Sequence, residues 1–339
     1  MIDTIIHSEQ WLAYAFAFLM GLSMLIYGLL DGYDLGVGIL SYYAKDKKES
    51  DQMVSSIGPF WDANETWLVL GVGILLVAFP KAHGIILSNL YIPVFIMLIG
   101  LIFRGVAFDF MSKSDNRHKK DWYYAFFAGS LTTALAQGFM LGSYIIGFEI
   151  DTLNSKLFVF TVSISLAVGY CLIGANWLIM KTTGDLQKKA IQWSKLSLIG
   201  AIICIALVSI GTPISNLTIF NKWFVLPNFY YLSLIPLLTI FFVLWMYLLL
   251  NKLPYSDDRY CWLPFVLTII IAILCFVGLV YSFFPFIIPN EMLIVQASAA
   301  NSSLMIIFVG ALIVLPILLG YTFFVYKVFH GKTTDLRYD

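Results

Sequence analysis

The chain has 339 residues, of which 60% are apolar, 17% aromatic and only 12% charged, and its formal net charge is zero. Soluble globular domains carry about a quarter charged residues, so this is not the composition of a soluble protein, and no basic tract indicates nucleic-acid binding. The apolar residues fall in runs of about 20 or more, which is the length a helix needs to cross roughly 30 Å of hydrocarbon.

The sequence predicts an all-α, polytopic membrane protein, because a helix satisfies its own backbone hydrogen bonds inside lipid. No signal peptide is apparent, since Asp3 and Glu9 precede the first apolar run in place of a positive region and that run is too long for an h-region. The first span is therefore expected to stay in the mature protein. About nine spans are expected, at 12–39, 63–80, 84–103, 122–147, 157–180, 196–214, 228–250, 262–284 and 303–327.

A single integral membrane domain, 1–339, is expected, with a first four-helix bundle (1–147), a second four-helix bundle (157–284) and a final helix with its tail (303–339). A duplication would explain two bundles, because internal repeats are common in membrane proteins, but direct repetition between the halves is weak. The longest loops are expected near 40–57, 104–121, 181–195, 215–227 and 285–302.

The basic residues predict the orientation of the chain. Among the 20 lysines and arginines, only Lys81, Lys156 and Lys222 flank the side that the N-terminus shares. Because cytoplasmic loops carry the excess of Lys and Arg, the N-terminus is expected outside and the C-terminus in the cytoplasm. This orientation requires an odd number of spans, in agreement with nine.

The first candidate site is the segment LDGYDLGVG, Leu30 to Gly38, near the cytoplasmic end of the first span. Asp31 and Asp34 are three residues apart and therefore share a helix face. Gly32 and Gly36 form a small-xxx-small pair that lets another helix approach closely. Two acids at such a contact could take up and release protons. The alternative interpretation is a pair of acids at a helix end, solvated by headgroups.

Two further segments are expected on the same cytoplasmic face. GPFWDANETW, Gly58 to Trp67, holds Asp62 and Glu65 at the entrance of the second span, where helix-dipole effects alone would also favour acids. FRGVAFDF, Phe103 to Phe110, holds Arg104 and Asp109 where the third span ends. Arg104 is expected to pair with a carboxylate of another helix and not with Asp109. The alternative is that the Arg104 side chain only snorkels to the lipid headgroups.

Acids and an arginine at one depth predict a water-accessible inlet for protons or ions, because ionisable groups beside lipid are costly and usually functional. A proton- or cation-coupled secondary transporter is the competing class, although transporters usually place such groups near the midplane. A third alternative is a structural subunit with passive acids. Gln137, Asn176 and Gln296 are expected to serve as interhelical hydrogen-bond glue.

No metal site is predicted, because the four cysteines are isolated and no metal-ligand spacing occurs. None of the four histidines lies at mid-span depth, so the chain has no evident way to hold its own haem in the bilayer. These histidines are His7, His83, His118 and His330.

The three site segments, with LLVAFP after the second, resemble subunit II of the cytochrome bd-type quinol oxidases. Further similar stretches are QGFMLGSYIIGF (137–148), GANWLIMKTTGDLQKKA (174–190) and PILLGYTFFVYKVFHGK (316–332), so the resemblance runs nearly end to end. The departures are small, namely Tyr33 where Phe is frequent, Ala63 where Gly is common and His330 where Arg is usual.

The resemblance implies a haem-free subunit of a bacterial cell-membrane complex that reduces dioxygen to water with electrons from quinol. The larger subunit I would carry two haems b and one haem d, and a small third subunit accompanies some complexes. Some family members hold a structural quinone in subunit II, but no motif here assigns that site. The resemblance also implies a cytoplasmic proton path through the acids, with Asp62 carried over first and Asp31, Asp34, Arg104 and Asp109 following by motif; Glu65 is added from its position beside Asp62.

Overall fold

The computed structural model describes residues 10–113, 119–255 and 257–333. Its elements in chain order are α2 (Trp11–Leu40), the 3₁₀ turn η1 (Ser41–Tyr43), α3 (Lys47–Ile57), α4 (Trp61–Ala78), α5 (Pro80–Lys113), α6 (Lys119–Ile145), α7 (Leu153–Lys181), α8 (Gly184–Ser215), α9 (Leu217–Phe224), α10 (Asn228–Leu232), α11 (Leu234–Leu250), α12 (Leu263–Phe283), β1 (Phe286–Ile288), β2 (Met292–Leu293), α13 (Ile294–Ala297) and α14 (Asn301–Val328).

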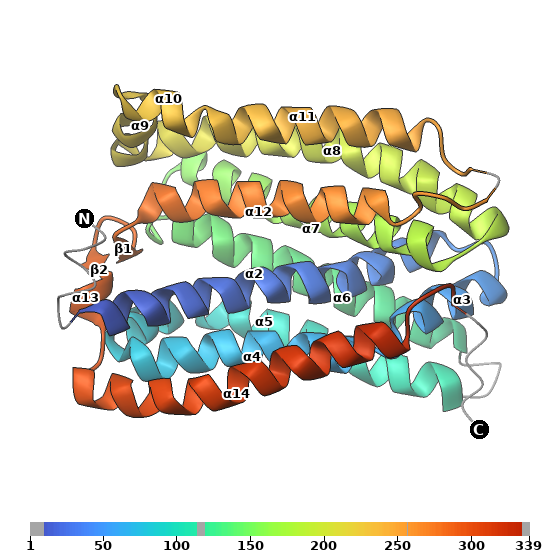
Figure 1. Ribbon diagram of the computed structural model, residues 1–339, viewed down its shortest axis with the longest axis horizontal. Helices are drawn as coiled ribbons and strands as arrows, with labels where there is room; N and C mark the ends of the chain where they lie inside the picture. The colour runs from blue at the N-terminus through green and yellow to red at the C-terminus, as the bar shows by residue number, and fades with distance from the viewer. Residues whose placement is uncertain (1–9, 114–118, 256, 334–339) are drawn as a thin grey trace.

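Within the described residues, nine helices are long and apolar enough to cross a membrane, as the sequence predicts. They lie side by side along the long axis of the molecule (Figure 1). One end carries α3 and the C-terminus of α14, and we call it the basic end because most lysines and arginines flank it. The opposite end carries α13 and the two strands, which form an antiparallel pair.

The helix α2 runs through the centre of the molecule and packs against α4, α6 and α7. Its contact with α7 depends on two glycines, as the spacing of small residues in LDGYDLGVG predicts. A Cβ atom on Gly36 would lie 1.7 Å from the backbone oxygen of Tyr170, and one on Gly174 would lie 2.6 Å from the backbone of Gly36. Only glycine allows the two backbones to approach this closely. The division into two four-helix bundles stays a prediction.

Two segments that we expected to be loops are largely helical. The segment 181–195 is the first part of α8, and 40–57 contains α3. Both are amphipathic: Leu186 and Ala190 are buried on one face of α8, and Met53 and Ile57 are buried on one face of α3. Charged residues on an outer helix face were therefore mistaken for a loop, because a helix can continue beyond the hydrocarbon.

The remaining loop predictions were also incomplete. The segment 215–227 contains α9, and 285–302 contains the two strands and α13. The third span is longer than predicted, because α5 runs without a break from Pro80 to Lys113. Arg104 and Asp109 therefore lie on the last three turns of one continuous helix, although we expected the segment after 103 to be a loop.

The C-terminus of α14 is fastened to the basic end by a cluster of polar contacts. Lys332 pairs with Asp258 at 2.5 Å, and Lys181 donates to the backbone oxygen of Phe329 at 2.6 Å. Asp258 also accepts from Gln187 and Cys261. Partial burial acts to raise the pKa of the Asp258 carboxyl, but these hydrogen bonds and Lys332 outweigh it and hold that pKa below its usual range.

Candidate functional site

Four ionisable side chains from three helices meet inside the bundle, and we call them the acid centre: Asp31 and Asp34 of α2, Glu65 of α4 and Arg104 of α5. Asp31 and Asp34 have no solvent-exposed surface, and Arg104 is 1% exposed. Burying charge is costly unless it is paired. The side chains of Asp31, Asp34 and Arg104 are therefore shielded from water and depend on partners inside the protein.

The Arg104 guanidinium bridges two of the acids. Its Nη1 lies 2.6 Å from Asp31 Oδ1, and its Nη2 donates to Glu65 Oε1. This confirms the prediction that Arg104 reaches a carboxylate of another helix. One guanidinium neutralises a single carboxylate. Three acids face this guanidinium, so the charge of the other two carboxylates can be neutralised by protons. Glu65, whose side chain is 28% exposed, is the member of the centre that connects with the surface.

Asp34 is held differently, by an amide instead of a cation. The Asn64 side chain of α4 donates to Asp34 Oδ2 at 2.8 Å. Asp34 Oδ1 and the Arg104 Nε have no hydrogen-bond partner among the described residues, while the Tyr27 hydroxyl interacts with Asp31. Buried polar atoms normally find a partner in protein or ordered water. These atoms are therefore the points where water or a transferred proton is best accommodated.

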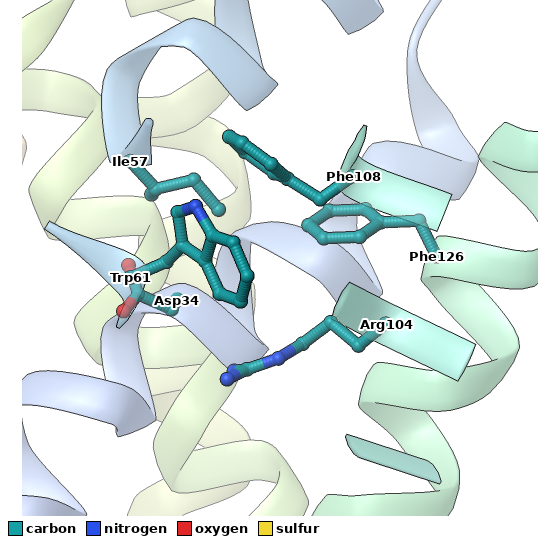
Figure 2. A pocket seen from close by; sticks show the side chains of 6 residues that line it. All are labelled: Asp34, Ile57, Trp61, Arg104, Phe108 and Phe126. Carbon is teal, nitrogen blue, oxygen red and sulfur yellow. The ribbon is translucent and has the colours of Figure 1, made fainter. Parts of the chain in front are cut away.

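A narrow cleft lies beside the centre and is lined by Asp34, Ile57, Trp61, Arg104, Phe108 and Phe126. Figure 2 shows the Trp61 indole between Ile57 and Arg104, with the rings of Phe108 and Phe126 beside it. The Trp61 and Phe108 ring centroids are 5.0 Å apart. The cleft is too narrow to admit a water molecule. Access to Asp34 by this path therefore requires the aromatic side chains to move.

A chain of neutral hydrogen bonds leads from the centre toward mid-span. Tyr170 of α7 donates to Gln137 Oε1 at 2.7 Å, and Gln137 of α6 donates to the Tyr27 hydroxyl at 2.5 Å. Tyr27 lies one turn before Asp31 on α2. The interhelical role predicted for Gln137 is confirmed, and so is that of Asn176, which binds Ser194 and Thr268.

The predicted role of Gln296 is wrong, because its side chain instead accepts from the backbone of Leu293 close by in sequence.

The other two predicted acids are placed at the surface. Asp62 lies one turn before Glu65 on α4 and is exposed, and Asp109 lies beyond Arg104 on α5 and is also exposed. Both therefore lie outside the buried acid centre, and the fold brings together four of the six predicted residues. Asn64, which binds Asp34, was not among the six predicted residues because they were selected by charge; its place between two tryptophans in WDANETW is the sequence signal that could have found it.

The described histidines do not fit the axial ligands of a haem within the bundle. His83 lies in the first turn of α5 at one end, and His330 follows α14 at the other; the predictions for His7 and His118 fall outside the described residues. No group of three or more His, Cys, Asp or Glu that could hold a metal ion occurs in the described ranges.

The fold and the site together define a multi-pass membrane protein with a buried cluster of charged side chains. The family described as cytochrome bd terminal oxidase subunit II matches residues 12–329. Because that match covers nearly the whole length, the chain belongs to this family of bacterial membrane proteins. The result favours the oxidase-subunit interpretation of the sequence over the transporter alternative.

Individual relatives agree with this assignment. The chain is 27% identical to cytochrome bd ubiquinol oxidase subunit 2 of Bacillus subtilis, with 90% of this chain and 92% of the relative covered. It is 25% identical to cytochrome bd-I ubiquinol oxidase subunit 2 of Escherichia coli, with 93% of each covered. The bd oxidase structure from Geobacillus thermodenitrificans matches the fold with a TM-score of 0.78 at 15% identity, over 94% of this chain and 98% of that chain.

Proposed function

We propose that this chain is the haem-free subunit II of a quinol oxidase and that its acid centre delivers protons from the cytoplasm to the oxygen-reducing site of a partner subunit. The observation that carries the proposal is the arrangement of Asp31, Asp34 and Glu65 around a single buried arginine. A cluster of acids that shares one counter-charge can gain or lose a proton at little electrostatic cost.

The route that we propose starts at the surface and ends at the two buried aspartates. Asp62 and Asp109, exposed near the basic end, gather protons there, and the partly exposed Glu65 receives them. Arg104 connects Glu65 with Asp31, which lies one helical turn from Asp34. The basic end then faces the cytoplasm, in agreement with the distribution of lysine and arginine.

The redox groups belong to the partner in this proposal. Haem b and haem d in subunit I would supply the electron transfer and the reduction of dioxygen, while residues of this chain move and hold protons. Subunit I is the expected partner because the relatives carry the name subunit 2 of a bd oxidase. A small third subunit and a structural quinone are compatible with the fold, and no described residue assigns a site to either.

The test replaces single acids by their amides in the complex purified with its native partner. Asp34→Asn and Asp62→Asn should assemble with normal haem spectra and lose quinol-dependent oxygen consumption, at least tenfold for the buried Asp34. The control is Asp185→Asn, because the side chain of Asp185 is 93% exposed and remote from the acid centre in its contacts.

Normal turnover in Asp34→Asn would refute the route through the acid centre and favour a structural subunit with passive acids. Normal turnover in Asp62→Asn alone would remove Asp62 from the route and leave Glu65 as the entrance.

A further inference from the structure

Three side chains beside Asp34 close a ring of hydrogen bonds. Asn64 of α4 donates to the Tyr33 hydroxyl of α2 at 2.8 Å, and the Tyr33 and Tyr326 hydroxyls are 2.7 Å apart. Tyr326 of α14 donates to Asn64 Oδ1 at 3.3 Å. Because Tyr326 uses its proton on Asn64, its oxygen accepts the proton of Tyr33. The donor and the acceptor are then fixed for every hydrogen bond in the ring.

The direction of the ring decides how Asn64 faces Asp34. The Asn64 amide nitrogen donates to the Tyr33 hydroxyl and to Asp34 Oδ2, each at 2.8 Å, and it has a longer contact of 3.4 Å with the Leu30 backbone oxygen. A flipped amide would instead present its carbonyl oxygen to Asp34 Oδ2, and Tyr326 would lose its acceptor. The donor held against Oδ2 leaves Oδ1, which has no partner among the described residues, as the oxygen that can carry a proton.

Aromatic packing fixes the ring in place. Tyr33 is fully buried and stacks on Trp177 of α7, with ring centroids 4.1 Å apart. Tyr326 packs against Phe60 at a centroid distance of 4.7 Å. Because both tyrosines are wedged between rings, their hydroxyls have little freedom to seek other partners. The last helix, α14, has few buried residues of its own. It is linked to the acid centre by the Tyr326 hydroxyl, which binds Asn64 beside Asp34.

We propose that Tyr33 and Tyr326 are positioning residues that hold the Asn64 amide in one orientation, so that Asp34 takes and releases its proton at Oδ1. The inference rests on the proposed proton route and adds α14 to it. The ionisable groups that face Asp34 are Asp31 of α2, Glu65 of α4, Arg104 of α5 and the two ring tyrosines; α3 and α6 contribute the apolar Ile57 and Phe126.

The experiment measures the pH profile of quinol-dependent oxygen consumption in the purified complex for Tyr326→Phe, Tyr33→Phe and the double variant. Each removes one oxygen atom and keeps the aromatic packing. The expected result is a shift of the profile by about one pH unit toward alkaline pH, a tenfold change in proton affinity, because the released amide can turn its carbonyl to Asp34. The double variant should shift no further than either single variant, since one break opens the ring.

The matched control is Tyr321→Phe, on the same helix but 56% exposed, which should keep the original profile. Unchanged profiles in the ring variants, with normal haem spectra, would overturn the proposal, and so would shifts that add in the double variant. If Tyr326→Phe failed to assemble, Tyr33→Phe would decide alone by the same criteria. Loss of turnover in Asp34→Asn combined with unchanged ring variants would refute the ring and leave the proton route standing.

Discussion

Removing the positive charge of Arg104 should destabilise the protein by about 3–5 kcal/mol, the usual cost of breaking a buried ion pair. The structure supports this size. Unit charges about 4 Å apart attract by about 4 kcal/mol at an effective dielectric constant of 20, and the fully buried Asp31 lies within this distance of Arg104.

Unfolding by SDS in mixed micelles, followed by tryptophan fluorescence, measures the loss of stability of Arg104→Met against wild type.

Two variants sharpen the test. Arg104→Met combined with Asp31→Asn should recover most of the loss, because no unpaired charge is then buried at that position. Lys188→Met removes an exposed ion pair with Asp185 and should change stability by less than about 0.5 kcal/mol. A loss in Arg104→Met that is no larger than in Lys188→Met, or that Asp31→Asn does not restore, would refute the charge argument.

Two further predictions concern packing and the C-terminal contacts. Gly36→Ala should prevent assembly of the complex, because the new Cβ atom would meet the α7 backbone. The control is Gly28→Ala, whose Cβ atom would have nothing within 4 Å and which should assemble normally. Size-exclusion chromatography measures the yield of assembled complex, and equal yields for the two variants would contradict the close contact. The lowered pKa of Asp258 gives stability that is present above its unfolded value of about 3.9 and is lost as the pH falls further. Asp258→Asn should accordingly speed hydrogen exchange in residues 329–333 at pH 7, and unchanged exchange would contradict a role in holding this segment.

The long apolar runs could be predicted from the sequence because hydrocarbon thickness fixes their length. The contact of α2 with another helix was predictable from Gly32 and Gly36, since small residues at this spacing permit it. The segment 181–195 differs from the prediction for a physical reason: Lys188 and Lys195, seven residues apart, share one face of a helix and leave Leu186 and Ala190 on the opposite, buried face.

The acid centre was predictable in its charged members and not in its neutral ones. Arg104 and the acids of α2 stand out because charge beside lipid is costly. Asn64 carries only a weaker signal, its place between two tryptophans, and Tyr33 and Tyr326 carry none, because tyrosine near a span end is ordinary. Their ring depends on α2, α4 and α14 meeting at one point, which no local spacing reveals.

The central claim is that protons for oxygen reduction pass through Asp34 from the side of the basic end. Its most direct test is the reaction of the fully reduced complex with dioxygen in vesicles that hold a pH dye on that side only. In wild type the dye should report proton uptake during haem reoxidation, and in Asp34→Asn the uptake should slow at least tenfold while oxygen binding stays fast. Uptake at the wild-type rate in Asp34→Asn, or a dye response on the opposite side, would contradict the account.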